Sequence, residues 1–184
     1  LLIFLGNVPS LDAISSASLL GFAKTELSRG TDLLRALAGA SGLSLTGARA
    51  GSLGETASLF IAAGGLVLLA LRIVTWHIPV AMIAGVALPA LLAHAIDPAR
   101  YLDVASHLLS GGVLLGAFYI ATDYVTSPNT KAGQLLFGFG CGFLTYVIRS
   151  WGGYPEGVAF AVLIMNACTP VIDRYLKPRI LGRT

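Results

Sequence analysis

The residues best suited to chemistry form one short segment near the start of the chain. Asp12-Ala-Ile-Ser-Ser-Ala-Ser-Leu-Leu20 gathers three serine hydroxyls among small neighbours. A helix N-terminus with several exposed N–H groups binds phosphate readily. Serine in front of an apolar run is also typical of a helix N-cap, because its oxygen accepts a backbone N–H. On these residues alone, the N-cap is the interpretation to prefer.

Three further polar clusters interrupt the apolar pattern: Gly51-Ser-Leu-Gly-Glu-Thr56, Ala121-Thr-Asp-Tyr-Val-Thr-Ser-Pro128 and Trp151-Gly-Gly-Tyr-Pro-Glu-Gly157. Acidic side chains at membrane depth are costly and usually functional. At helix ends, however, Glu55 and Glu156 suit N-caps or solvated positions at least as well. Trp151 and Tyr154 carry the amphipathic rings of an interfacial belt, on which a flat aromatic cofactor could also stack.

The histidines and cysteines do not indicate a metal site. His94 and His107 stand alone, without a second histidine at i+3 or i+4, and such a residue is more typical of a hydrogen-bonded structural position. Cys141 and Cys168 both lie inside apolar runs, so we expect two buried small hydrophobes. The sequence also contains no Ser/His/Asp triad pattern or glycine-rich nucleotide loop, so we expect no self-contained soluble-type active site.

The composition indicates which kind of fold must position these residues. Of 184 residues, 55% are hydrophobic and 11% are charged, whereas a soluble domain carries about 25% charged residues. The apolar residues form long blocks separated by short polar connections, which is typical of a multispan helical membrane protein in a lipid bilayer. The net charge of +3 is small and scattered, so we expect no nucleic-acid partner.

The hydrophobic blocks predict an all-α integral membrane fold with five transmembrane helices, at about 55–74, 78–96, 105–122, 132–148 and 157–172. The opening run, residues 1–5, is expected to be the end of a sixth, truncated helix from a longer protein. Residues 6–53 form a polar or weakly apolar interval, 54–176 the five-helix membrane domain, and 177–184 a basic tail.

Small residues and prolines within the spans suggest how the helices pack. Pairs and single glycines allow close helix–helix approach, and packing is their preferred interpretation; they are Gly64, Gly65, Gly111, Gly112, Gly116, Gly138, Gly140 and Gly142. Pro89 and Pro170 lie deep in their spans, where proline kinks or breaks a helix. A broken helix often marks the site in a transporter-like bundle, although an ordinary kink is the commoner outcome.

Basic residues predict the orientation. Arg72, His77 and Lys131 lie in connections on the same side as the basic tail, whereas Arg100 and Arg149 are assigned to short loops on the other side. The positive-inside rule then makes the C-terminus cytoplasmic and residues 6–53 periplasmic. Glu55, Glu156 and the serine segment would therefore share one face of the membrane.

These motifs, together with Ser106-His-Leu-Leu-Ser-Gly-Gly112, resemble the RnfD component of the Rnf ion-translocating electron-transport complex of the bacterial inner membrane. A close relative is the NqrB component of the sodium-pumping NADH:quinone oxidoreductase. The resemblance runs from Asp12 to about Arg179. It implies a ten-span fold in two halves of five, similar to urea transporters, of which this chain would be the second half plus the end of the fifth span.

The resemblance also implies a cofactor. The family carries FMN through a phosphoester bond to a threonine in a segment reading Asp-x-x-Ser-Gly-Ala-Thr or a near variant. The match places the acceptor hydroxyl at Ser18 and makes four neighbours the recognition motif for a flavin transferase: Asp12, Ser15, Ser16 and Ala17. This chain has serine where threonine is usual, Leu19 in place of a common proline, and Tyr124 where proline is frequent.

The remaining candidates for the flavin surroundings or a coupling path are Glu55, Trp151, Tyr154 and Glu156. A second, non-covalent flavin such as riboflavin is left open. The resemblance implies that the complex passes electrons between reduced ferredoxin and NAD while moving H⁺ or Na⁺, with other membrane and redox subunits as partners. Two alternatives stay open: a urea-transporter-like channel or carrier, and a structural subunit without flavin.

Overall fold

The computed structural model describes residues 58–98, 101–154 and 156–177, and the elements within these ranges are helices. In chain order they are α5 (Ser58–Ala70), α6 (His77–Ile96), α7 (Val104–Leu109), α8 (Val113–Leu115), the π-helical turn η1 (Gly116–Ile120), α9 (Lys131–Trp151) and α10 (Val158–Tyr175). The prediction of an all-α protein is confirmed for this part of the chain.

Within the described residues, three helices are long and apolar enough to cross a membrane: α6 with 20 residues, α9 with 21 and α10 with 18. They coincide with the second, fourth and fifth predicted spans. The helix at the first predicted span, α5, has 13 residues within the described part of the chain, fewer than the roughly 20 that cover a bilayer. The N-terminal end of that predicted span, 55–57, lies outside the described residues.

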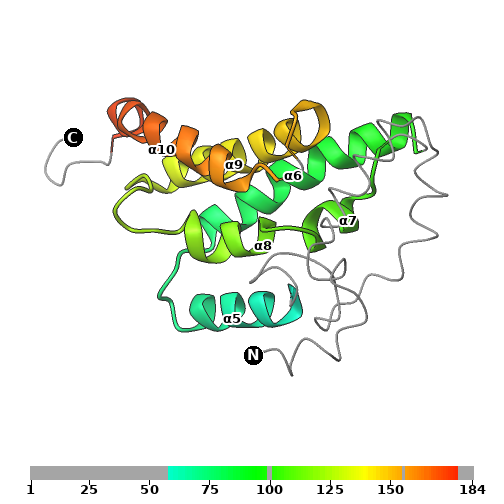
Figure 1. Ribbon diagram of the computed structural model, residues 1–184. Coiled ribbons are helices and arrows are strands. Elements are labelled where there is room, and N and C mark those ends of the chain that lie inside the picture. Colours follow the sequence, from blue (N-terminus) through cyan, green and yellow to red (C-terminus); the bar gives the residue numbers. More distant parts are fainter. Residues whose placement is uncertain (1–57, 99–100, 155, 178–184) are drawn as a thin grey trace, which may run out of the picture.

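Among the described helices, α6 and α9 share the most extensive contact and run side by side (Figure 1). Glycines make this approach possible. A Cβ atom on Gly85 would lie 2.5 Å from the carbonyl oxygen of Phe139, and one on Gly138 would lie 2.6 Å from that of Ile78. A Cβ on Gly142 would collide with the carbonyl oxygen of Met82. The predicted packing role of Gly138 and Gly142 is therefore confirmed.

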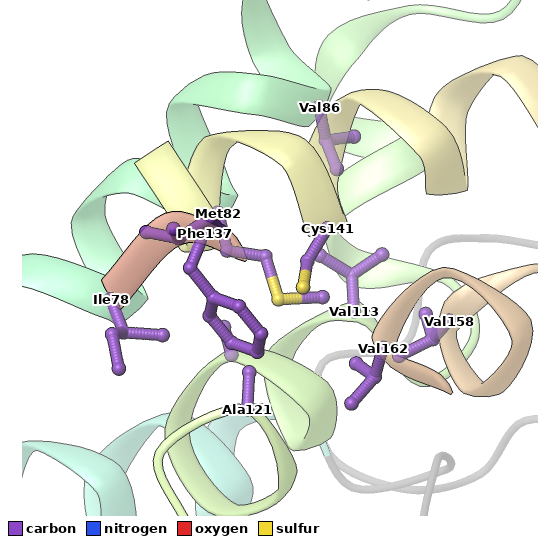
Figure 2. Close-up of a cluster of buried hydrophobic side chains, with 11 residues drawn as sticks. Ile78, Met82, Val86, Val113, Ala121, Phe137, Cys141, Val158 and Val162 are labelled. Atoms are coloured by element: carbon purple, nitrogen blue, oxygen red, sulfur yellow. The ribbon is translucent and has the colours of Figure 1, made fainter. Parts of the chain in front are cut away.

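The core lies where α6, α9, α10 and the third predicted span meet. Figure 2 shows Met82, Val86, Phe137 and Cys141 packed there with Val113, and all five are fully buried. The prediction for Cys141 is thus confirmed. The prediction for Cys168 is wrong, because its side chain is exposed on α10. An apolar run in a membrane helix leaves open which face is buried, since lipid accepts apolar side chains too.

The third predicted span, 105–122, is interrupted rather than continuous. Helix α7 ends at Leu109, Ser110 is extended, and Gly111 has a φ of +69°, in the region that favours glycine. A second helical piece, α8 followed by η1, starts at Val113 (Figure 1). By contrast, Pro89 and Pro170, for which the sequence leaves a kink or a break open, lie inside α6 and α10, which continue past them.

The π-helical turn docks onto α5. Phe118 and Tyr119 lie over Gly65 and Gly64, whose missing side chains leave room for the two rings. The Tyr119 hydroxyl donates a hydrogen bond to the carbonyl oxygen of Ile61, at 3.1 Å. The predicted packing role of Gly64 and Gly65 is confirmed, and π-helical turns often occur near functional sites.

Candidate functional site

The interruption of the third span is the most polar buried place in the described part of the chain. A helix that stops leaves its last carbonyl groups without intrahelical donors, and an unsatisfied carbonyl inside a membrane protein is costly. Three backbone oxygens at the end of α7, those of His107, Leu109 and Ser110, accept hydrogen bonds from side chains on other helices. We call the segment Ser110–Gly112 the break.

Arg149, in the last turn of α9, supplies two of these bonds. Its Nη1 donates to the carbonyl oxygen of His107 at 2.7 Å, and its Nη2 donates to that of Ser110 at 3.2 Å. Only 1% of its side chain is exposed. The assignment of Arg149 to a short loop is therefore wrong. Helix α9 continues to Trp151, because a charge that is hydrogen-bonded and neutralised need not end a membrane helix.

Glu156 neutralises Arg149. Both carboxylate oxygens accept from Nη2, at 3.0 and 3.1 Å, and 32% of the glutamate side chain is exposed. The connection between α9 and α10 therefore folds back onto α9. Helix α10 begins after Gly157 as its N-cap, so the structure does not place Glu156 at that position. A charge-assisted pair of this kind is stronger than a hydrogen bond between neutral groups.

Gly111 is required here for two reasons. Its positive φ is strained for any residue with a Cβ. In addition, a Cβ at this position would collide with the Glu156 carboxylate and would lie 2.5 Å from Arg149 Nη2. The ion pair therefore packs directly against the backbone of the break.

Ser58 on α5 also binds the C-terminal end of α7, next to the break. It is the first residue of α5, it is buried, and its hydroxyl donates to the carbonyl oxygen of Leu109 at 2.9 Å. Side chains from α5 and α9 thus donate hydrogen bonds to carbonyl groups at the C-terminal end of α7. Neither Ser58 nor Arg149 was among the predicted site residues. The available signal was an arginine inside an apolar run, seven residues from a glutamate across a Gly-Gly-Tyr-Pro connection.

Two histidines close to this end of the bundle, His94 and His107, differ in their hydrogen bonding. The ring of His94 makes a 2.9 Å hydrogen bond with the carbonyl oxygen of Tyr101, as predicted for a structural histidine. His107 is buried and packs against Tyr146 with ring centroids 5.3 Å apart. Its Nδ1 has no hydrogen-bond partner among the described residues, which is uncommon for a buried polar atom.

Trp151 ends α9 and Tyr154 lies on the connection that carries Glu156, and both rings are largely exposed. Trp151 contacts Tyr146 edge-on at a centroid distance of 5.8 Å, and Tyr154 contacts Phe160 at 5.4 Å. The structure thus brings three of the predicted residues to one end of the bundle. The other predicted site residues lie outside the described residues: Asp12, Ser15, Ser16, Ala17, Ser18 and Glu55.

A second polar cluster ties the connection before α9 to the last turn of α10. The backbone and side-chain nitrogens of Asn129 donate to the two carboxylate oxygens of Asp173, at 3.2 and 3.4 Å. The Thr169 hydroxyl donates to the carbonyl oxygen of Thr126 at 3.0 Å. Because Asn129 precedes α9 and Arg149 lies at its other end, this cluster and the break mark opposite ends of the bundle. Across the described ranges, no three His, Cys, Asp or Glu side chains gather as a metal site would need.

Comparison with known proteins identifies the family. The family model described as NQR2, RnfD, RnfE matches residues 3–182. A relative from Stutzerimonas stutzeri, named as the D subunit of an ion-translocating oxidoreductase complex, is 52% identical over 174 residues, covering 94% of this chain and 49% of the relative. Relatives of the same name from Halorhodospira halophila and Alcanivorax borkumensis are 45% and 44% identical, over 94% and 98% of this chain.

The chain spans about half the length of these relatives, which it matches over 49%, 49% and 52% of their residues. Its three long apolar helices agree with a multi-pass membrane protein. The family predicted from the motifs is confirmed: the chain belongs to the NQR2, RnfD, RnfE family.

Proposed function

We propose that this chain is the flavin-bearing part of a membrane subunit of an ion-translocating oxidoreductase complex, with FMN attached through a phosphoester bond to Ser18. The observation that carries this proposal is the family match over residues 3–182, which includes the segment from Asp12 to Ser18. That segment supplies a hydroxyl with small neighbours, which a flavin transferase needs in order to reach the nucleophile. Serine retains the hydroxyl that threonine would offer.

The residues between the end of α9 and the start of α10, at the same end of the bundle as the break, suit a flavin nearby. Trp151 and Tyr154 are 65% and 62% exposed, so their rings are accessible to an aromatic ring system. Glu156, one-third exposed, adds a carboxylate next to them. In this proposal the chain positions the cofactor and sets its electrostatic surroundings, while bound flavin supplies the redox chemistry.

We further propose the arrangement of the whole subunit. The described helices would be half of a ten-helix bundle similar to urea transporters, in the bacterial inner membrane. The C-terminus would be cytoplasmic and residues 6–53 periplasmic, which places Ser18 on the side of Glu156. Partner subunits would exchange electrons between reduced ferredoxin and NAD as the complex moves H⁺ or Na⁺.

The test is coupled activity in membrane vesicles that contain the full complex. Ser18→Ala is expected to abolish ferredoxin-to-NAD electron transfer and the accompanying ion movement, whereas Ser18→Thr is expected to retain both. Ser28→Ala, which removes a hydroxyl outside the motif, serves as the control and is expected to be neutral. Full electron transfer in Ser18→Ala would contradict the proposal and favour a structural subunit. Solute flux through the isolated protein would instead favour a channel or carrier.

A further inference from the structure

The oxygen atoms around Arg149 form a set that suits a small cation. They are the carbonyl oxygens of His107 and Ser110 and both carboxylate oxygens of Glu156, which lie 2.7 to 3.2 Å from the guanidinium nitrogens. In membrane transporters, unwound backbone carbonyls and the C-terminal ends of half-helices coordinate Na⁺ or H⁺. Here a positively charged side chain occupies such a place.

The charges at the break support this comparison. The C-terminal end of α7 contributes partial negative charge from its carbonyl groups, and Glu156 contributes a full negative charge. A second carboxylate, that of Asp103, is the N-cap of α7 and accepts from the backbone nitrogen of Ser106 at 3.3 Å. The Arg149 guanidinium thus offsets the charge of Glu156. Without the guanidinium, the two carbonyl oxygens and the Glu156 carboxylate would together carry the single negative charge of the carboxylate.

Arg149 is held in this place by its own helix. Its side chain is 1% exposed, whereas that of Glu156 is 32% exposed, so the glutamate lies on the more accessible side of the pair. Glycine contacts fix α9 against α6, and the Cβ-free Gly111 lets the pair lie against the backbone. The arginine therefore cannot leave the oxygens without breaking several contacts at once.

We infer that Arg149 is a tethered cation that occupies a built-in monovalent-cation site at the break of the third span and keeps free cations out. A single carboxylate with neutral carbonyl oxygens matches a monovalent ion better than Ca²⁺ or Mg²⁺, which take more oxygen ligands or keep their water. This inference concerns α7, the break, α9 and the connection between α9 and α10 that carries Glu156, and it does not depend on flavin at Ser18.

Removing the arginine side chain tests the inference. The intact protein carrying Arg149→Ala, purified in detergent in its native assembly, is compared in NaCl and in choline chloride at equal ionic strength. Na⁺ is expected to raise the melting temperature of this variant by about 3 °C, because an ion that binds only the folded state stabilises it. Millimolar guanidinium is expected to give a similar rise. The unaltered protein is expected to respond to neither.

Two matched variants sharpen the result. Arg174→Ala removes an exposed arginine from the last turn of α10 and is expected to create no Na⁺ response. Arg149→Ala combined with Glu156→Gln is expected to abolish the response, because the oxygens then lack a net charge. Equal melting temperatures of Arg149→Ala in Na⁺ and choline would overturn the inference, as would an unchanged response in the double variant. If Arg149→Ala accumulates poorly, Na⁺ or guanidinium during purification must restore its yield; failure of both also overturns it.

Discussion

Two contacts that hold this bundle together differ in their physical basis. The seam between α6 and α9 depends on close packing. Gly85, Gly138 and Gly142 have no side chain, so a carbonyl oxygen of the facing helix lies where a Cβ atom would be. The break is held by polar bonds from Arg149, Glu156 and Ser58. A seam of the first kind needs only small residues at helical spacing. The second kind needs partners from separate helices, and every partner must be present.

The largest effect is expected at the ion pair. Arg149→Met should lower the free energy of unfolding by about 3 kcal/mol, because it leaves carbonyls unsatisfied and removes the partner of Glu156. Glu156→Gln should cost less, since the glutamate is one-third exposed and solvent screens its charge. A double-mutant cycle followed by thermal unfolding in detergent should show that the two losses are not additive. Additive losses would mean that the two residues act separately.

The next effect is expected at the seam. Gly142→Ala should lower the free energy of unfolding by about 2 kcal/mol, because its Cβ meets the rigid carbonyl of Met82 and the helices must separate. Gly153→Ala is the control, since nothing lies within 4 Å of a Cβ there. It should change the free energy by less than about 0.5 kcal/mol. Equal melting temperatures for the two variants would contradict the packing explanation.

A smaller effect is expected on the α5 side of the break. Ser58→Ala removes the buried hydroxyl that serves the carbonyl of Leu109, and should cost about 1 kcal/mol. Ser58→Thr retains the hydroxyl and is the conservative comparison. Hydrogen exchange at the amides of the break should rise in the alanine variant while exchange in α9 stays unchanged. Unchanged exchange at the break would show that Ser58 contributes nothing there.

The smallest effect is expected from loss of the Tyr119 hydroxyl in the π-helical turn. Tyr119→Phe removes one partly exposed hydrogen bond to the carbonyl of Ile61 and should cost about 0.5 kcal/mol. Phe118→Ala, which empties the buried contact with Gly65, should cost more than Tyr119→Phe, because it removes the packing of a buried ring. Thermal unfolding of the two variants side by side measures the difference. A larger loss for Tyr119→Phe would mean that the hydroxyl, rather than ring packing, docks η1 onto α5.

The same contrast explains what the sequence could predict. The positions of α6, α9 and α10 follow from long apolar runs, and the seam follows from glycines within them. The break did not follow, because Ser110-Gly-Gly112 inside an apolar run is equally typical of close packing. Arg149 falls just past the predicted span 132–148, so the sequence assigns it to a loop. Only the folded connection shows that Glu156 neutralises it.

The candidate site was predicted only in part for a similar reason. Trp151, Tyr154 and Glu156 are neighbours in sequence, so a shared location was readable from the chain. Ser58 and Arg149 join the break from helices far apart in sequence, and no local pattern connects them. The motif from Asp12 to Ser18 remains a prediction that rests on the family match.

The central claim, flavin attachment at Ser18, is tested most directly by the intact mass of the protein purified after coexpression with a flavin transferase. The account predicts a mass increase of one FMN less one water, which alkaline hydrolysis removes, Ser18→Ala abolishes and Ser18→Thr retains. An unmodified mass for the unaltered chain, with the transferase active on another substrate, would contradict it.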